Sequence, residues 1–266
     1  MKIAIIGTGN LGKSIAKGLI KGQNFNSLYL TKRNVSELND LPKQENIIIT
    51  SDNSKAIQNS DVLIFAVQPK QLEEILFQSK EYINKEQLVI STITGFSIEK
   101  IENILGQGFS IIRAMPNTAI AVEKSMTCIS ANTDDTSKIT IAESIFNQLG
   151  NSMIIPENLM QAATVVCASG IAFWMRLIRA TTQAAIQLGF DAKEAQELAM
   201  FTSEGAANLL IQSGNHPEQE IDKVTTPKGC TIEGLNEMEH KGLSSSLIQG
   251  MVASFNKINT IKKEQI

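Results

Sequence analysis

Hydrophobic and polar residues follow different patterns in the first and second parts of the chain. Up to residue 118, short apolar runs occupy residues 3–6, 27–30, 47–50, 61–67, 88–92 and 111–118. Between the runs, apolar residues recur with helical spacing, as at Ile15, Leu19 and Ile20 after the first run. Strands that alternate with helices in this way predict an α/β fold built on a doubly wound parallel sheet.

From Pro156 onward the pattern is helical. Segments 157–188, 192–212, 232–240 and 244–261 have helical spacing, and no strand-like run follows. We therefore predict two domains, an α/β domain over residues 1–155 and an all-α domain over residues 156–266. The segment 157–188 is rich in Ala, Thr and Gly, which suits close helix packing either in a core or across a subunit interface.

Composition and charge exclude some classes of protein. The 266 residues are 42% hydrophobic and 19% charged, as in ordinary globular proteins, and the net charge of −3 gives no basic footprint for nucleic acid. The widely separated Cys128, Cys167 and Cys230 fit no zinc spacing and no disulfide framework, so we expect no metal site. We expect the three cysteines to be inert packing residues of a protein in a reducing compartment. We expect no signal peptide, because the chain begins in a strand. We expect no membrane span, because the longest uncharged apolar stretch, 161–175, is shorter than the roughly 20 residues that a span needs. Together these expectations predict a cytoplasmic protein.

Three glycines separate the first apolar run from the first helical segment. Gly7, Gly9 and Gly12 form a G-x-G-x-x-G in the strand–turn–helix context of dinucleotide-binding proteins. In that context Gly7 allows the tight turn, Gly9 lets a pyrophosphate approach the backbone, and Gly12 lets the helix pack closely on the strand. Free N–H groups at the start of the helix face the phosphate. The motif predicts a bound dinucleotide; an ordinary glycine-bearing turn is the alternative.

The residues after the second apolar run indicate which dinucleotide is bound. An NAD site usually has an Asp or Glu about 20 residues past the glycines, where it bonds the ribose 2′-hydroxyl. Here the chain reads Thr31-Lys32-Arg33-Asn34, and no carboxylate occurs between Lys13 and Ser36. Two cations and a hydroxyl suit a 2′-phosphate. We therefore predict NADP(H) in preference to NAD(H), with a solvated basic turn as the alternative.

Polar residues also stand at later positions where ligands bind. Gln68-Pro69, Thr94-Gly95 and Asn117 follow apolar runs, and ligands bind at the carboxyl ends of parallel strands. In the helical part, Thr225-Thr226-Pro227 precedes Gly229-Cys230-Thr231, which opens a helix. The backbone N–H groups of such a helix start suit a small carboxylate, although a plain capped helix is the simpler interpretation.

Taken together, these segments resemble the pyrroline-5-carboxylate reductase family, which catalyses the last step of proline synthesis. The similarity covers nearly the whole chain and is carried by IGTGNLGKSIAKGL at 6–19, AVQPKQ at 66–71, RAMPNT at 113–118, SGNHPE at 213–218 and DKVTTPKGCTIEGLNEME at 222–239. The resemblance implies a Rossmann-type domain and a helical C-terminal domain that forms an intertwined homodimer, often in a ring of dimers. The implied reaction is hydride transfer from NAD(P)H to the C=N carbon of 1-pyrroline-5-carboxylate, giving L-proline.

The resemblance also implies which residues contact the ligands. By position, the cofactor contacts are Ile6, Gly7, Thr8, Gly9, Asn10, Leu11, Gly12, Thr31, Lys32, Arg33, Asn53, Ala66, Val67, Gln68, Pro69, Ile93, Thr94, Gly95 and Asn117, with Asn117 near the nicotinamide. The substrate contacts are Thr226, Gly229, Cys230 and Thr231. The Thr231 hydroxyl faces the ring nitrogen and is the implied catalytic group.

The chain departs from the family pattern near the substrate. Residues 167–173 read CASGIAF in place of S-G-S-G-P-A-Y, Lys228 replaces a glycine, and Cys230 replaces a small residue. The size of the substrate ring therefore stays open. Two other functions also stay open. One is a related reductase that acts on another imine, on a β-hydroxy acid or on a flavin-like carrier. The other is an inactive regulator that binds NADP(H). The absence of lysine between Glu157 and Asp191 counts against the hydroxy-acid reductase.

Overall fold

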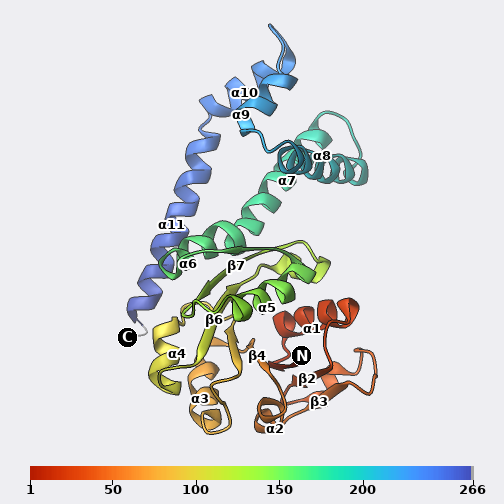
Figure 1. The fold of residues 1–266 in the computed structure, drawn as a ribbon. Helices are drawn as coiled ribbons and strands as arrows, with labels where there is room; N and C mark the ends of the chain where they lie inside the picture. Colours follow the sequence, from red (N-terminus) through yellow and green to blue (C-terminus); the bar gives the residue numbers. More distant parts are fainter. Residues whose placement is uncertain (265–266) are drawn as a thin grey trace. The chain divides into compact units, whose positions relative to one another are not determined.

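The computed structural model describes residues 1–264, and side chains as far as residue 258. An eight-stranded sheet with strand order β3-β2-β1-β4-β5-β6-β7-β8 forms the N-terminal part (Figure 1). Neighbouring strands run parallel except for β6 and β7. The strands are β1 (Lys2–Ile6), β2 (Ser27–Thr31), β3 (Ile47–Thr50), β4 (Val62–Phe65), β5 (Leu88–Ser91), β6 (Ser110–Met115), β7 (Ser125–Ala131) and β8 (Gly150–Ile154). The predicted doubly wound parallel sheet is confirmed, with the antiparallel β6–β7 pair as its exception.

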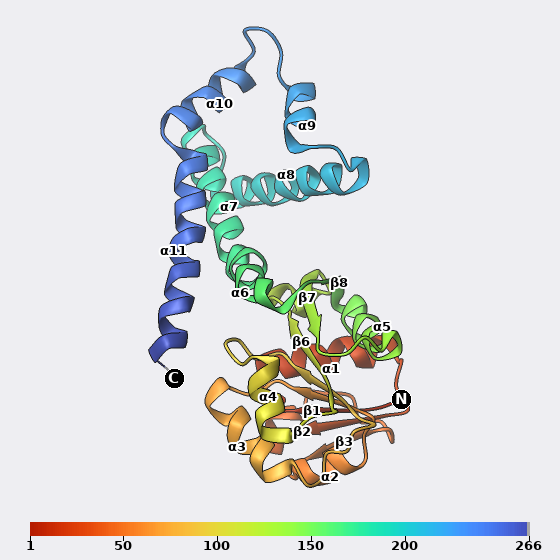
Figure 2. The same cartoon turned by 60° about the vertical axis from the view of Figure 1, so that its left-hand side comes forward.

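Alternate side chains of each central strand enter two separate cores. Ile3 and Ile5 of β1 pack with α1 (Asn10–Gly22) and α5 (Thr136–Phe146), whereas Ala4 and Ile6 pack on the opposite face. That second face is covered by α2 (Asn53–Gln58), α3 (Pro69–Ser79) and α4 (Ile98–Leu105), as Figures 1 and 2 show. Burial on both faces explains why the central strands read as unbroken apolar runs.

Three elements of the sheet domain, α5, β7 and β8, have no counterpart among the predicted runs. Strand β7 pairs antiparallel with β6 and places Cys128 opposite Met115. Its polar side chains Ser125, Thr127 and Ser130 are nearly fully buried, at 1%, 0% and 3% exposure. Because these buried positions are polar, β7 lacks the apolar pattern by which the other central strands are recognised.

The rest of the described chain is helical, as predicted. It comprises η4 (Glu157–Leu159), α6 (Met160–Ala163), a π-helical segment (Thr164–Ser169), α7 (Gly170–Gln187), α8 (Ala192–Ser213), α9 (Pro217–Val224), α10 (Cys230–His240) and α11 (Leu243–Glu264). The single helix predicted over 157–188 is thus interrupted by the π-helical segment. Helix α9 lies outside the predicted helical segments, and the ring nitrogen of His216 caps it by accepting a hydrogen bond from the Glu218 N–H (3.3 Å).

Contacts divide the chain into a sheet unit and a helical unit. The sheet unit comprises Met1–Ser169 with the last part of α11 from Ile258, and the helical unit comprises Gly170–Lys257. In the described chain, the helical run Glu157–Gln187 is long and apolar enough to cross a membrane, judged by length and composition only. The expectation that no segment spans a membrane therefore stays a prediction.

Candidate functional site

The turn between β1 and α1 requires glycine at two positions. Gly7 has a φ of +94°, and a Cβ added there would lie 2.3 Å from Val67 Cγ1. A Cβ added at Gly12 would lie 2.3 Å from the Gly7 carbonyl oxygen. A Cβ added at Gly9, the N-cap of α1, would have no other described part of the chain within 4 Å, and Gly9 provides no side-chain cap. The turn is therefore tight at Gly7 and Gly12 and open at Gly9, where helix N–H groups are available to an anion.

A cavity of about 680 Å³ lies beside this turn. It is formed at the carboxyl ends of β1, β2 and β4, where the strand order reverses, which is the usual ligand position in such sheets. Its volume is within the range of small-molecule and cofactor sites. Ten of the predicted cofactor residues line it: Gly7, Thr8, Gly9, Thr31, Lys32, Arg33, Asn53, Ala66, Val67 and Gln68. Sequence reasoning missed its other lining residues, Asn34, Glu37, Ser51, Gln71, Glu74, Ile75 and Gln78.

The remaining predicted cofactor residues lie outside the cavity lining. Ile6 is buried in β1, Asn10, Leu11 and Gly12 begin α1, and Pro69 is the first residue of α3. The others, Ile93, Thr94, Gly95 and Asn117, follow β5 and β6. The cavity thus gathers the residues expected around the phosphates and the ribose, and not those expected near the nicotinamide.

Asn117 uses its side chain to hold two neighbouring segments. Its Oδ1 accepts a hydrogen bond from the Ala119 N–H (3.0 Å), and its Nδ2 donates to the Cys167 carbonyl oxygen (3.1 Å). The residue is only 7% exposed. Thr94, on the preceding loop, donates its hydroxyl to Met115 Sδ (3.6 Å). Asn117 therefore fixes the backbone of the π-helical segment, and sequence reasoning did not foresee this positioning role.

Two cysteines far apart in the sequence meet beside Asn117. Cys128 Sγ and Cys167 Sγ are 3.8 Å apart, and Cys128 is buried. The hydrogen bond from Cys128 stabilises the Cys167 thiolate and lowers the pKa of Cys167, while the same contact raises the pKa of Cys128. The two thiols are thus neighbours in the fold although they are far apart in sequence, and the expectation that they are inert packing residues stays a prediction. In the described chain, no group of three or more His, Cys, Asp or Glu residues is arranged to hold a metal ion.

The residues after β2 form an ionic arrangement at the edge of the cavity. The Thr31 hydroxyl oxygen accepts a hydrogen bond from the Gly7 N–H (3.1 Å), so it stabilises the glycine turn. Lys32 Nζ lies 2.7 Å from Glu37 Oε2. Arg33 is exposed and has no ionic partner among the described residues. Glu37 directly follows the carboxylate-free stretch that suggested NADP(H), so a carboxylate does reach this cavity.

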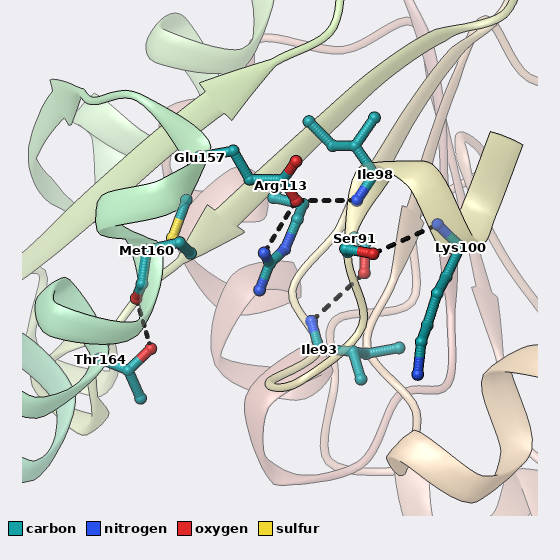
Figure 3. A network of polar contacts seen from close by, with 9 residues as sticks. Ser91, Ile93, Ile98, Lys100, Arg113, Glu157, Met160 and Thr164 are labelled. Atoms are coloured by element: carbon teal, nitrogen blue, oxygen red, sulfur yellow. Dashed lines mark hydrogen bonds and ion pairs between the residues drawn. The ribbon is translucent and has the colours of Figure 1, made fainter. Parts of the chain in front are cut away.

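A buried arginine connects three segments behind the loop that follows β5. Arg113 Nη1 donates to Glu157 Oε1 (2.9 Å), and the same oxygen accepts a hydrogen bond from the Ile98 N–H (2.8 Å), as Figure 3 shows. The Arg113 side chain is 8% exposed. The pair therefore joins β6, the first residue of α4 and η4, and it fixes the end of the loop that carries Thr94.

The predicted substrate residues form the start of α10 in the helical unit. Gly229 is the N-cap and supplies no side-chain cap, and its N–H donates to the Thr226 carbonyl oxygen (2.9 Å). Cys230 and Thr231, in the first turn, are exposed. Lys228 adopts a left-handed conformation with φ +58°, which explains why a glycine suits this position in the family pattern. The arrangement offers N–H donors and a threonine hydroxyl to a small anion.

Comparisons with known proteins agree with this geometry. The family model for pyrroline-5-carboxylate reductase dimerisation matches residues 157–261, and the model for coenzyme F420-dependent NADP oxidoreductases matches residues 2–95. Pyrroline-5-carboxylate reductase 2 of Dictyostelium discoideum is 40% identical over 96% of this chain and 91% of its own length. Pyrroline-5-carboxylate reductase 1 of the same organism is 43% identical over 96% of this chain, which spans about half (49%) of that longer protein.

A solved structure supports the same assignment. The structure of a pyrroline-5-carboxylate reductase from Coxiella burnetii superposes with a TM-score of 0.91 at 30% identity, covering 97% of both chains. The agreement therefore extends over the sheet domain and the helical domain alike. The chain belongs to the pyrroline-5-carboxylate reductase family.

Proposed function

We propose that this protein reduces 1-pyrroline-5-carboxylate to L-proline by hydride transfer from NAD(P)H. The observation that carries the proposal is the 40% identity to a pyrroline-5-carboxylate reductase over 96% of the chain. The cavity at the glycine turn and the uncapped start of α10 supply the two kinds of binding site that the reaction needs.

The residues around the cavity fit a dinucleotide cofactor. A Cβ added at Gly9 would meet no chain atom within 4 Å, and the start of α1 has no side-chain cap, which suits the close approach of a pyrophosphate to the helix N-terminus. When bound, NAD(P)H supplies the hydride. Lys32 and Arg33 support a preference for NADP(H) over NAD(H), because a 2′-phosphate binds best beside cations. The other predicted contacts, from Ile6 to Gly12 and at Asn53, Ala66–Pro69, Ile93–Gly95 and Asn117, are proposed on the family resemblance.

The start of α10 is the proposed substrate site. The backbone of Gly229 and Cys230, with Thr226, would contact the carboxylate. The Cys230 N–H would be the donor there, since the Gly229 N–H is bonded to the Thr226 carbonyl oxygen. The Thr231 hydroxyl would donate a hydrogen bond to the ring nitrogen. An imine is readily protonated, and its iminium form is already electrophilic. The protein therefore needs mainly to position the ring and to stabilise the changing charge on nitrogen. This explains how the chemistry proceeds without an assigned histidine or lysine.

The helical domain gives the basis for self-association. Its match to the dimerisation model and its exposed apolar residues Trp174 and Phe201 support a homodimer. We further propose a ring of dimers in the cytoplasm without membrane insertion, so that the apolar surface of Glu157–Gln187 is covered by protein. The start of the dimerisation match at residue 157 supports the proposed domain boundary at residues 155 and 156, whereas the contacts within the chain divide its two units after Ser169.

A steady-state assay tests the reaction. The absorbance of NADPH should fall when 1-pyrroline-5-carboxylate is added to the protein, and proline should accumulate in equal amount. The six-membered homologue of the imine, assayed in parallel, reports whether the departures at residues 167–173 and Lys228 change the accepted ring size. Binding of NADPH without turnover of either ring would contradict the proposal and indicate a regulator instead.

A further inference from the structure

The cavity edge after β2 carries a carboxylate that is held in place by its own turn. Asn34 Oδ1 accepts hydrogen bonds from the Ser36 N–H (3.3 Å) and from the Ser36 hydroxyl (2.7 Å), which closes the chain into η1 (Val35–Leu38). Leu38 is fully buried and anchors this turn in the core. As a result, the Glu37 side chain faces back toward Lys32 at the edge of the cavity.

A second set of contacts ties the same turn to the first helix. Lys13 Nζ, from α1, donates to the Glu37 carbonyl oxygen (3.1 Å) and pairs with Asp40 (2.5 Å). The backbone of Glu37 is therefore fixed from two sides, by α1 and by the buried Leu38. The carboxylate belongs to the wall of the cavity, since the turn that carries it has little freedom to move away.

The charges at this edge are partly compensated. Lys32 Nζ lies 2.7 Å from Glu37 Oε2, and this hydrogen bond, followed by the positive charge of Lys32, lowers the pKa of Glu37. Glu37 is therefore ionised at neutral pH. Among the described residues that line this edge, Arg33 is the cation without an ionic partner, whereas Lys32 is already paired. The cavity thus presents one available cation where the sequence suggests two.

This arrangement affects the two nicotinamide cofactors in opposite ways. A 2′-phosphate carries up to about two negative charges near neutral pH, so it must compete with Glu37 for Lys32 and is repelled by the carboxylate. A 2′-hydroxyl instead donates a hydrogen bond to a carboxylate, as in NAD sites. We propose that Glu37 sets the cofactor preference of this enzyme by holding Lys32, so that it limits the advantage of NADPH and favours binding of NADH. This inference rests on the proposed function in one respect, namely that the ligand of the cavity is a nicotinamide dinucleotide.

Direct binding to the full chain tests this role. Dissociation constants for NADPH and NADH are measured from nicotinamide fluorescence without imine, in the wild type and in Glu37→Gln. The variant keeps the shape of the side chain and removes its charge. We expect NADPH to bind about three- to tenfold more tightly, as for one partly exposed charge contact, and NADH to bind more weakly. Added salt should reduce the gain for NADPH, because it screens the charges.

Asp40→Asn is the matched control. It removes a neighbouring carboxylate that pairs with Lys13 and Lys17 but does not line the cavity. The ratio of the two dissociation constants should stay as in the wild type. The Glu37 side chain is 54% exposed, so its substitution leaves the core intact, which a thermal unfolding curve verifies.

Lys32→Met provides the second arm. It should weaken NADPH more than NADH, and Glu37→Gln added to it should give a smaller gain for NADPH than in the wild type, because only the direct repulsion by the carboxylate is then removed. An unchanged ratio in Glu37→Gln, equal changes for both cofactors, or a gain in the Lys32→Met background as large as in the wild type would each overturn the proposal. If the imine is not reduced at all, the proposed function fails, but the shift in the binding ratio still decides the role of Glu37.

Discussion

The two units of the chain treat their apolar side chains differently. In the sheet unit, large residues such as Phe65 and Phe146 are fully buried between the strands and the helices of the same unit. In the helical unit, Trp174 is 61% and Phe201 is 66% exposed, and the buried described residues are small ones such as Ala195 and Ala199. The sheet unit covers its own core, whereas the helical unit needs a second copy of the chain to cover its apolar surface.

The same contrast applies to the two binding regions. The sheet unit contains a formed cavity of about 680 Å³, fixed by the glycine turn and by the ionic contacts of η1. The helical unit contains an exposed helix start with Thr231 in its first turn. Cofactor affinity should therefore depend on the sheet unit alone, while imine reduction should depend on both units.

The largest expected effect is on self-association. Phe201→Asp places a charge on the exposed apolar surface of α8, and in a symmetric dimer each substitution acts twice. We expect the dimer to weaken by about 100-fold or more, as for the loss of an aromatic hot spot. Analytical ultracentrifugation measures this. Phe77→Asp, at a 52% exposed residue of α3 in the sheet unit, should leave the dimer intact; equal behaviour of the two variants would contradict the comparison.

Next in size is the effect of Thr231 on catalysis. Thr231→Ala removes the hydroxyl proposed to face the ring nitrogen, and by analogy with an oxyanion donor it should raise the barrier by about 2–4 kcal/mol. The expected result is a large loss of kcat with unchanged affinity for NADPH. Thr225→Ala is the matched control, because the Thr225 hydroxyl donates to the Asp222 carbonyl oxygen at the end of α9. Near-normal kcat in Thr231→Ala would remove the catalytic role.

A smaller effect is expected from alanine substitutions in the glycine turn, where Gly12 should matter for stability and Gly9 for cofactor binding. Gly12→Ala forces a Cβ against the Gly7 carbonyl oxygen and should lower the free energy of unfolding by about 1–3 kcal/mol. Gly9→Ala meets no chain atom, so it should keep the stability and weaken NADPH binding instead. Thermal unfolding and fluorescence titration measure the two quantities. Similar loss of stability in both variants would mean that Gly9 is required by the fold and not by the cofactor.

The smallest predicted change concerns Lys228. Lys228→Gly relieves a left-handed conformation but adds freedom to the unfolded chain, so the net gain should be below about 1 kcal/mol. Chemical denaturation of the helical unit within the full chain measures it. Lys241→Gly, at a residue in ordinary right-handed conformation, should instead destabilise the protein. A loss of stability in Lys228→Gly would show that its side chain makes a contact that offsets the strain.

Hydrophobic pattern was enough to predict the sheet as far as β6 and most of the helices. Both faces of β1 and β4 are buried, so their sequences are apolar throughout and easily recognised. The pattern failed for β7, whose buried Ser125 and Thr127 hydrogen bond to each other and look like surface residues in the sequence. It also missed α9, a short and mostly polar helix that depends on its His216 cap.

The candidate site was predictable only where it is local in sequence. The glycine turn and the start of α10 are continuous motifs, so their backbone geometry follows from the residues. Glu37 escaped notice because its role depends on the η1 turn that folds it back to Lys32. The Cys128–Cys167 pair and the Arg113–Glu157 pair join residues 39 and 44 positions apart, and no sequence spacing reveals such contacts.

The transfer of a hydride to the imine carbon can be followed directly with deuterium. The protein is incubated with 1-pyrroline-5-carboxylate and NADPH that carries deuterium at the transferred position of the nicotinamide, and proline is analysed by mass spectrometry. We predict proline with one deuterium at C5, formed in equal amount to the oxidised cofactor. Proline without deuterium, or oxidation of the cofactor without proline, would contradict hydride transfer to a cyclic imine as the reaction of this enzyme.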